Sequence, residues 1–149
     1  MTEWLDDAQQ SAWRKLIEVV ELLPGALDTQ LRHDADLSHF DYFTLAMLSE
    51  APDRTLRMTA LAELTNATLP RLSHVASRLE ERGFLTRTPC PSDRRATNAT
   101  LTEAGWRKVV DTAPGHVDTV RDLVFAELDA TDVADLDRIM SRILGRLGR

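Results

Sequence analysis

Cysteine is nearly absent from this sequence, because Cys90 is the one cysteine among 149 residues. A single thiol cannot form a disulfide within the chain, and no pair of cysteines or cluster of cysteine and histidine has the spacing of a zinc site. The four histidines are scattered, without a close pair of the HExxH type. We therefore expect neither a structural metal nor a cofactor.

Long apolar runs are also missing. No stretch approaches the roughly 18 apolar residues that a membrane helix needs, and the sequence does not begin with the basic segment and apolar stretch of a signal peptide. We therefore expect a cytoplasmic protein with no membrane partner. The sequence also lacks a glycine-rich phosphate loop and a recognisable set of nucleophile, base and acid, so we expect that it is not an enzyme.

Positive charge is in the minority, because 18 lysines and arginines face 24 aspartates and glutamates, for a formal net charge of -6. The charge is unevenly distributed. Residues 54–108 hold ten basic and five acidic side chains, a net of +5, whereas the remainder holds eight and nineteen, a net of -11. Since phosphate contacts depend on local charge, this pattern indicates a middle segment that meets a polyanion. Chance clustering of charges is the alternative.

Helical patterns account for most of the two ends of the chain. Apolar residues spaced by three and four predict a helix over residues 3–23, with a kink or break at Pro24-Gly25. Thr102 is expected to cap another helix, interrupted near Pro114, and a last helix begins after Thr131. These terminal helices carry long apolar stripes with little else to cover them, so we expect a homodimer.

The middle of the chain predicts short helices joined by short connections. Ser38 and Asp41 have the pattern of a capping box, which opens a helix that ends near Glu50. Thr59 is expected to cap a short helix, and Thr68 to cap the next one after a polar turn. Two helices joined in this way are typical of a helix-turn-helix.

The helix that begins after Thr68 has two different faces. One side of its helical wheel carries apolar residues: Leu69, Leu72, Val75, Ala76 and Leu79. The opposite side and its border consist mostly of hydrogen-bond donors: Arg71, Ser73, His74, Ser77 and Arg78. Such donors can reach base edges and phosphates in a major groove. A merely solvated polar face is the alternative.

A period of two replaces the helical pattern after Gly83, which stands where a helix C-terminus needs a residue that tolerates positive φ. Residues 84–88 and 97–101 are rich in β-forming side chains and predict two strands. The segment between them contains prolines together with Arg94 and Arg95, which predicts a projecting, basic hairpin tip. Such a wing favours DNA binding, because the negative potential of a minor groove attracts arginine.

Six short motifs share their order and spacing with one protein family. They are Leu61-Ala62, Ser73, Arg78-Leu79-Glu80, Gly83-Phe84-Leu85-x-Arg87, Asp93-Arg94-Arg95 and Leu101-Thr102-x-x-Gly105. Across roughly residues 38–106, the sequence resembles the MarR family of winged helix-turn-helix transcription regulators. The flanking segments fit this family only in length and apolar pattern.

The resemblance implies a mainly α fold with a small β wing, in a single MarR-type domain over residues 1–149. Its winged helix-turn-helix lobe would occupy residues 38–106, and its dimerisation helices residues 1–35 and 108–149. Two recognition helices, near residues 68–82 of each subunit, would occupy successive major grooves of a pseudo-palindromic operator.

The resemblance also assigns roles to individual side chains. Arg95, in the wing near residues 84–101, would enter the minor groove, oriented by a salt bridge with Asp93. His74 is a departure, because many relatives carry arginine after the Ser or Thr of this helix, so no operator sequence is transferred from them. The expected DNA-binding residues are Thr68, Arg71, Ser73, His74, Ser77, Arg78, Arg94 and Arg95.

Aromatic and thiol side chains suggest regulation. Trp13, Phe40 and Phe43, with Trp4 and Tyr42 as further candidates, would line a pocket for a small aromatic or phenolic effector where the dimer helices meet the DNA-binding lobe. Core or interface packing is the alternative. Cys90 is expected to be an inert surface thiol on the exposed wing; a thiol open to oxidation, its thiolate stabilised by Arg87, Arg94 and Arg95, is the alternative.

These features predict a sequence-specific, ligand-responsive transcriptional repressor that binds operator DNA as a homodimer. A winged-helix module for protein interaction, without specific DNA binding, is the alternative. The arginine-rich wing beside a donor-rich helix distinguishes the two, because an interaction module has no need of that combination.

Overall fold

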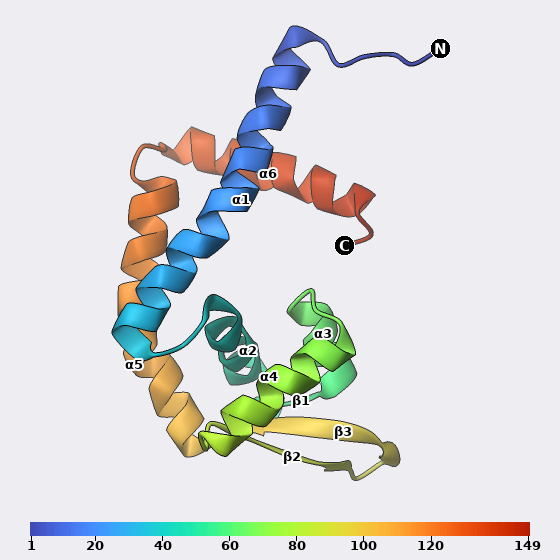
Figure 1. Cartoon of the computed structure of the whole chain (residues 1–149), viewed down its shortest axis with the longest axis vertical. Coiled ribbons are helices and arrows are strands. Elements are labelled where there is room, and N and C mark those ends of the chain that lie inside the picture. Colours follow the sequence, from blue (N-terminus) through green and yellow to red (C-terminus); the bar gives the residue numbers. More distant parts are fainter.

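The computed structural model describes all 149 residues and is mainly helical (Figure 1). Its helices are α1 (Asp7–Ala35), α2 (His39–Glu50), α3 (Met58–Leu64), α4 (Leu69–Glu81), α5 (Glu103–Val120) and α6 (Ala130–Arg146). A 3-10 turn, η1 (Pro52–Arg54), precedes the sheet, and a π-helical turn, η2 (Arg121–Phe125), follows α5. None of the helices combines the length and apolarity that crossing a membrane would need.

Three antiparallel strands form a small sheet in the order β1-β3-β2. The strands are β1 (Thr55–Arg57), β2 (Leu85–Cys90) and β3 (Asp93–Leu101). Leu85 lies opposite Leu101 at the base of the β2–β3 hairpin, and the register shifts between Pro89 and Cys90 near its turn. In Figure 1 this hairpin projects from the lobe beside α4, so the structure confirms a mainly α fold with a small β wing.

The hydrophobic core packs α2, α3 and α4 against the sheet, and the C-terminal end of α1 and the beginning of α5 complete it. Leu45, Leu61 and Leu72 are fully buried in this core, and burial of each such side chain contributes about 2 kcal/mol to folding. By contrast, α6 buries no residue, and α1 buries only residues from its last third. Figure 1 accordingly shows most of α1 extending away from the lobe, crossed by α6.

The two long helices are more continuous than the sequence predicts. α1 runs unbroken through Pro24 and Gly25, so the expected kink or break there is wrong. α5 likewise contains Pro114 in its interior. A proline removes only one intrahelical donor, and helices of 29 and 18 residues keep their remaining hydrogen bonds on both sides of it.

Three local expectations in the lobe are also corrected. Thr59 does not cap α3, because β1 leads directly into this helix, which begins at Met58 without a side-chain cap. Leu69 does not belong to the buried stripe of α4, because it is the first helical residue and 44% of its surface is exposed. Strands β2 and β3 extend into the segment expected to be a loop, so that Pro91 and Ser92 alone form the turn.

Most expected helix ends are confirmed. Ser38 and Asp41 form a reciprocal capping box at the start of α2, with N–O distances of 2.9 Å in both directions. Thr68 and Thr102 cap α4 and α5 through their hydroxyl oxygens. Gly83 has a φ of 81°, the left-handed conformation that ends α4 and turns the chain into the wing.

A close contact joins the beginning of the wing to the beginning of α5. The Thr102 hydroxyl donates to the carbonyl oxygen of Gly83 at 2.6 Å, and the Thr102 amide donates to that of Phe84 at 3.0 Å. Gly105 lies so close to this segment that an added Cβ would be 2.1 Å from the Phe84 carbonyl oxygen. The position therefore requires glycine for steric reasons, although it lies in a helix.

Gly105→Ala is expected to lower the free energy of unfolding by about 1–3 kcal/mol, the usual cost of overpacking. Gly25→Ala is the matched control, because nothing lies within 4 Å of its added Cβ, and alanine at this helical position is expected to stabilise by about 0.5–1 kcal/mol. Urea unfolding followed by circular dichroism measures both changes. Equal effects of the two substitutions would contradict the close approach at Gly105.

Candidate nucleic-acid interface

Helix α4 is held in the lobe by its apolar face. Leu72, Val75, Ala76 and Leu79 are all buried in the core, so the opposite face of the helix is directed outward. At its beginning, the Thr68 side chain accepts a hydrogen bond from the Arg71 amide at 3.3 Å. Burial therefore fixes which side chains α4 presents to a partner.

One edge of α4 is attached to α2 by two arginines. The Arg71 guanidinium lies over the Phe40 ring, 4.2 Å from its centroid. Arg78 Nη2 lies 3.3 Å from Asp41 Oδ1, and Asp41 is the buried carboxylate that also caps α2. Both arginines remain exposed on their outer side, so each combines a contact within the lobe with a charge available to phosphate.

The other edge of α4 is attached to the wing by Arg87 of β2. Its guanidinium donates to the hydroxyls of Ser77 at 2.8 Å and Ser73 at 3.4 Å. It also forms an ion pair with Glu80 at 3.2 Å, and the other Glu80 oxygen accepts from the Arg87 amide at 2.7 Å. The sequence motifs include Arg87 and Glu80, but they give no sign that these side chains hold two of the expected DNA-binding serines.

His74 lies between these two edges on the outward face. Its side chain is exposed and takes part in none of the side-chain hydrogen bonds and ion pairs of the structure. Among the predicted base-reading side chains of α4, it is therefore the one left free of contacts within the lobe.

The wing presents two exposed arginines beside this helix. Arg95 Nε lies 3.5 Å from Asp93 Oδ1, which also accepts from the Arg95 amide at 3.1 Å. The Arg95 side chain is 94% exposed. Because the ion pair is fully accessible to water, it orients the guanidinium without neutralising it strongly.

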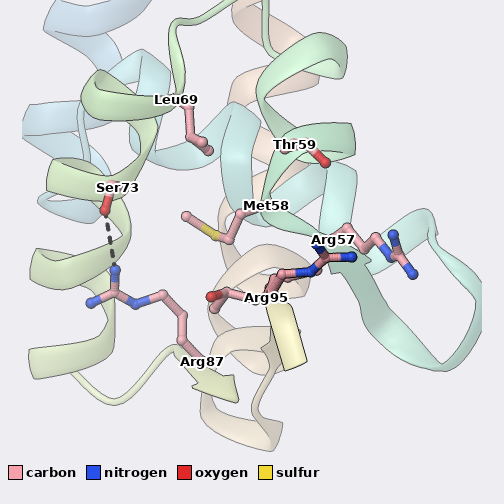
Figure 2. Close-up of a pocket in the computed structure, with 9 residues that line it drawn as sticks. Arg57, Met58, Thr59, Leu69, Ser73, Arg87 and Arg95 are labelled. Carbon is pink, nitrogen blue, oxygen red and sulfur yellow. Dashed lines mark hydrogen bonds between the residues drawn. The ribbon is translucent and has the colours of Figure 1, made fainter. Parts of the chain in front are cut away.

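A basic notch of about 200 Å³ separates the wing from α4 (Figure 2). Arg57, Arg87 and Arg95 line it, and Thr59 and Ser73 add two hydroxyls. Nothing in the sequence indicates that Arg57 lines such a notch, because β1 is too short to show a strand period, and Thr59 is expected only as a helix cap. Figure 2 shows that they approach the notch from the side opposite Ser73 and Arg87.

Comparison with known proteins identifies the family to which this combination of helices and wing belongs. A model described as the MarR family matches residues 37–97. Sco3205, a MarR family transcriptional regulator from Streptomyces coelicolor solved in complex with DNA, is 43% identical, with a TM-score of 0.92 over 96% of this chain and 90% of that chain. The chain belongs to the MarR family. The resemblance inferred from the motifs is thereby confirmed, and MarR family transcription regulators are generally not enzymes.

Two further MarR-type structures show how far the fold extends. AbsC, a MarR family transcriptional regulator from Streptomyces coelicolor, is 38% identical and has a TM-score of 0.93, covering 99% of this chain and 100% of that chain. CouR from Rhodococcus jostii RHA1, solved with p-coumaroyl-CoA, is 24% identical with a TM-score of 0.75, covering 86% and 87%. The similarity to AbsC includes the terminal helices as well as the lobe.

Trp13, Phe40 and Phe43, the three aromatics assigned to an effector pocket, have different surroundings in this MarR family protein. Trp13 is 50% exposed on α1. Phe40 packs against the core beneath Arg71, and Phe43 stacks on His39 with ring centroids 6.3 Å apart. None of the three lines the basic notch or the groove described next.

An apolar groove of about 620 Å³ lies between α1 and the C-terminal segment. Eight of its ten lining residues are hydrophobic, from α1, η2, the segment after it and α6. They are Val19, Leu22, Leu23, Ala26, Leu123, Val124, Leu128 and Leu136. None of the three predicted effector-binding aromatics lines this open, mostly apolar groove.

A histidine pair that the sequence does not reveal lies where α2 meets α5. The rings of His39 and His116 are 6.1 Å apart, and Tyr42 lies 4.7 Å from His116. Burial lowers the pKa of both histidines from its usual value, and the neighbouring His39 lowers that of His116 further. Nδ1 of His116 is buried without a hydrogen-bond partner. Burial therefore favours the neutral form of both rings.

Cys90 is not exposed on the wing as expected. Only 6% of its surface is accessible, and its own hairpin covers it, because it lies outside the hydrophobic core. The Ser92 hydroxyl, 3.3 Å from the sulfur, and the Ser92 amide lower the pKa of the Cys90 thiol to about 7. Arg57, rather than an arginine of the wing itself, supplies the positive charge that adds to this effect.

The rate of Cys90 alkylation by iodoacetamide is expected to rise with pH through an apparent pKa of about 7. Ser92→Ala should move this apparent pKa upward, because it removes the largest cause of the shift. Ser141→Ala in α6 is the control and should leave the profile unchanged. A parent profile that titrates near the ordinary thiol value of 9.0 would contradict the hydrogen-bond assignment.

Proposed function

We propose that this protein binds double-stranded DNA in a sequence-specific manner, as a homodimer, through α4 and the wing. The observation that carries the proposal is the outward donor face of α4 beside the exposed arginines Arg94 and Arg95. An α-helix fits into a major groove, and an arginine-tipped hairpin can follow into the adjacent minor groove. The DNA complex of Sco3205, 43% identical to this chain, supports the same use of the fold.

The negative net charge does not oppose this function. Residues 54–108 carry ten basic and five acidic side chains, and they include α4, the wing and the notch. Attraction to phosphate depends on the charge close to the DNA, because charges more than about 10 Å away are largely screened at physiological salt. Of the 24 acidic side chains, 16 lie in residues 1–37 and 107–149, outside the lobe.

Dimerisation is proposed for the helices within residues 1–35 and 108–149, flanking a DNA-binding lobe over residues 38–106. Large apolar side chains are exposed along these helices: Trp13, Val19, Val20, Leu22, Val117, Leu123, Ile139, Ile143 and Leu144. An exposed apolar surface of this extent is typical of a subunit interface. A twofold dimer would place two copies of α4 against half-sites about 34 Å apart, one turn of DNA.

Ile139→Asp is expected to dissociate the homodimer, because it places a charge on the exposed apolar stripe of α6. Sedimentation equilibrium should give twice the chain mass for the parent protein and a lower mass for the variant. Asp135→Asn, a change on the same helix that adds no charge, is the control. A folded parent that is monomeric at micromolar concentration would contradict the proposed interface.

The roles of the individual residues follow from their attachment to the lobe. His74, free of internal contacts, and Arg71, near the N-terminus of α4, are proposed to contact base edges. Arg78, fixed by Asp41, is proposed to anchor a phosphate. Arg94 and Arg95 are proposed to reach the minor groove. Thr68, Ser73 and Ser77 complete the proposed DNA-binding set.

His74→Ala is expected to reduce the preference for a selected operator over random duplex by about 1–3 kcal/mol, the range for one base contact. Arg95→Ala should weaken binding to both duplexes alike, because the minor groove distinguishes bases poorly. Arg14→Ala, which removes the same charge from α1, is the control. Competition binding, after selection of an operator from random duplexes, measures affinity and preference together.

The salt dependence of binding distinguishes DNA binding from the alternative function, a protein-interaction module. The logarithm of the affinity should fall linearly with the logarithm of salt concentration between about 50 and 200 mM if several arginines neutralise phosphates. A flat response, or variants that all behave as the parent does, would favour a protein-interaction module with a merely solvated basic face.

We infer further that the regulator represses transcription and releases DNA when it binds a small apolar or aromatic ligand. The groove of about 620 Å³ between α1 and the C-terminal segment has the size and apolar lining typical of ligand sites. CouR, which has this fold, was solved with p-coumaroyl-CoA. A ligand that separates the terminal helices would change the spacing of the two copies of α4, and so the affinity for DNA, without touching DNA.

A further inference from the structure

We propose that Arg87 is a positioning residue that makes Ser73 and Ser77 hydrogen-bond donors toward DNA, so that these two serines select acceptor groups on the bases. This inference rests on the proposed function, because it specifies how α4 distinguishes one sequence from another. Arg87 itself faces the wing side of α4 and acts through the serines.

The guanidinium of Arg87 is fixed before any DNA arrives. Nη2 donates to Ser77 Oγ at 2.8 Å and Nη1 donates to Ser73 Oγ at 3.4 Å, the contact drawn in Figure 2. Glu80 holds the same residue through Nη2 and through its backbone amide. The Arg87 side chain is only 23% exposed, so its planar guanidinium group is held in one orientation. Both serines therefore keep their hydrogen bonds to it.

A serine hydroxyl has one proton to donate and two lone pairs that accept. When Arg87 occupies a lone pair, the proton must be directed to a different partner. Inside helices that partner is commonly a backbone carbonyl one turn earlier, and the hydroxyls of Thr44, Ser49 and Thr65 all donate in this way.

Ser73 and Ser77 make no such bond to a helix carbonyl, and Arg87 is their one side-chain partner. Their protons therefore remain available to a group outside the helix. Hydrogen bonds in series strengthen one another, so a hydroxyl that accepts from a cation is also a better donor. The two serines thus present donors beside the exposed imidazole of His74.

A hydroxyl that already accepts from Arg87 keeps one lone pair but favours donation, so it is more selective than a freely rotating one. In the major groove it therefore pairs preferentially with N7 of a purine, O6 of guanine or O4 of thymine, over the amino groups of adenine and cytosine, which only donate. Without Arg87, each hydroxyl could rotate to accept from those amino groups or return to its own helix backbone. Removal of Arg87 should therefore relax base preference as well as weaken binding.

A double-mutant cycle on the full-length protein tests this coupling. The parent, Ser77→Ala, Arg87→Met and the double variant are compared by their preference for the selected operator over random duplex. Each single variant is expected to lower this preference about fivefold or more, the loss that corresponds to one base contact. The double variant should then lose little more than the larger single effect, because Arg87 acts through the serine.

Operators with 7-deazapurines at single positions provide the chemical readout. These bases lack the N7 acceptor and leave the amino groups in place. At a position contacted by Ser73 or Ser77, the parent should lose affinity on substitution, whereas Arg87→Met should lose much less. A purely structural role of Arg87 would leave the two proteins with equal sensitivity at every position.

Two controls separate folding from recognition. Arg82→Met removes the arginine that directly follows α4, which pairs with a carboxylate, that of Asp36, but touches no serine; it should leave base preference unchanged. Ser77→Ala keeps the Arg87–Glu80 ion pair, so its effect remains measurable even if Arg87→Met lowers the melting temperature.

The outcomes distinguish the inference from the function on which it rests. A parent that selects no sequence from random duplexes overturns the proposed function, and this inference with it. A parent that selects an operator, combined with preference losses for Ser77→Ala and Arg87→Met that multiply in the double variant, overturns the role of Arg87 alone. Equal weakening of operator and random duplex by Arg87→Met overturns it as well.

Discussion

The burial of one face of α4 is the constraint on which the candidate interface depends. Leu72, Val75, Ala76 and Leu79 fill the space between α2, α3 and the sheet, and together they outweigh any single polar contact of this helix. With that face of α4 fixed, the side chains along its two edges can contact only α2 on one side and the wing on the other. Arg78 meets Asp41 on one edge and Arg87 meets Ser77 on the other, so polar contacts refine an orientation that apolar packing has already set.

Features that depend on local periodicity were predictable from the sequence. The 3.6-residue period separated the buried and outward faces of α4, and the change to a period of two after Gly83 located the wing. Capping residues such as Ser38 and Thr102 were recognisable because a cap is a relation between residues only three positions apart. The motifs were specific enough to identify the family before the fold was known.

Features that depend on how distant segments meet were not predictable. The Arg87 bonds to Ser73 and Ser77 require both the pitch of α4 and the register of β2 against β3, neither of which one motif contains. The meeting of His39 with His116 depends on how α2 packs on α5. For the same reason, composition alone cannot show whether Trp13 and Phe43 meet at one cavity.

The two ends of the molecule differ in charge as well as in shape. The lobe, residues 38–106, carries eight basic and eight acidic side chains, whereas residues 1–37 and 107–149 carry ten and sixteen, a net of -6. These flanking residues include the helices that extend from the lobe in Figure 1. A polyanion therefore repels the flanking helices more than the lobe, so that encounters through the lobe, with its exposed Arg94 and Arg95, are favoured over encounters through those helices.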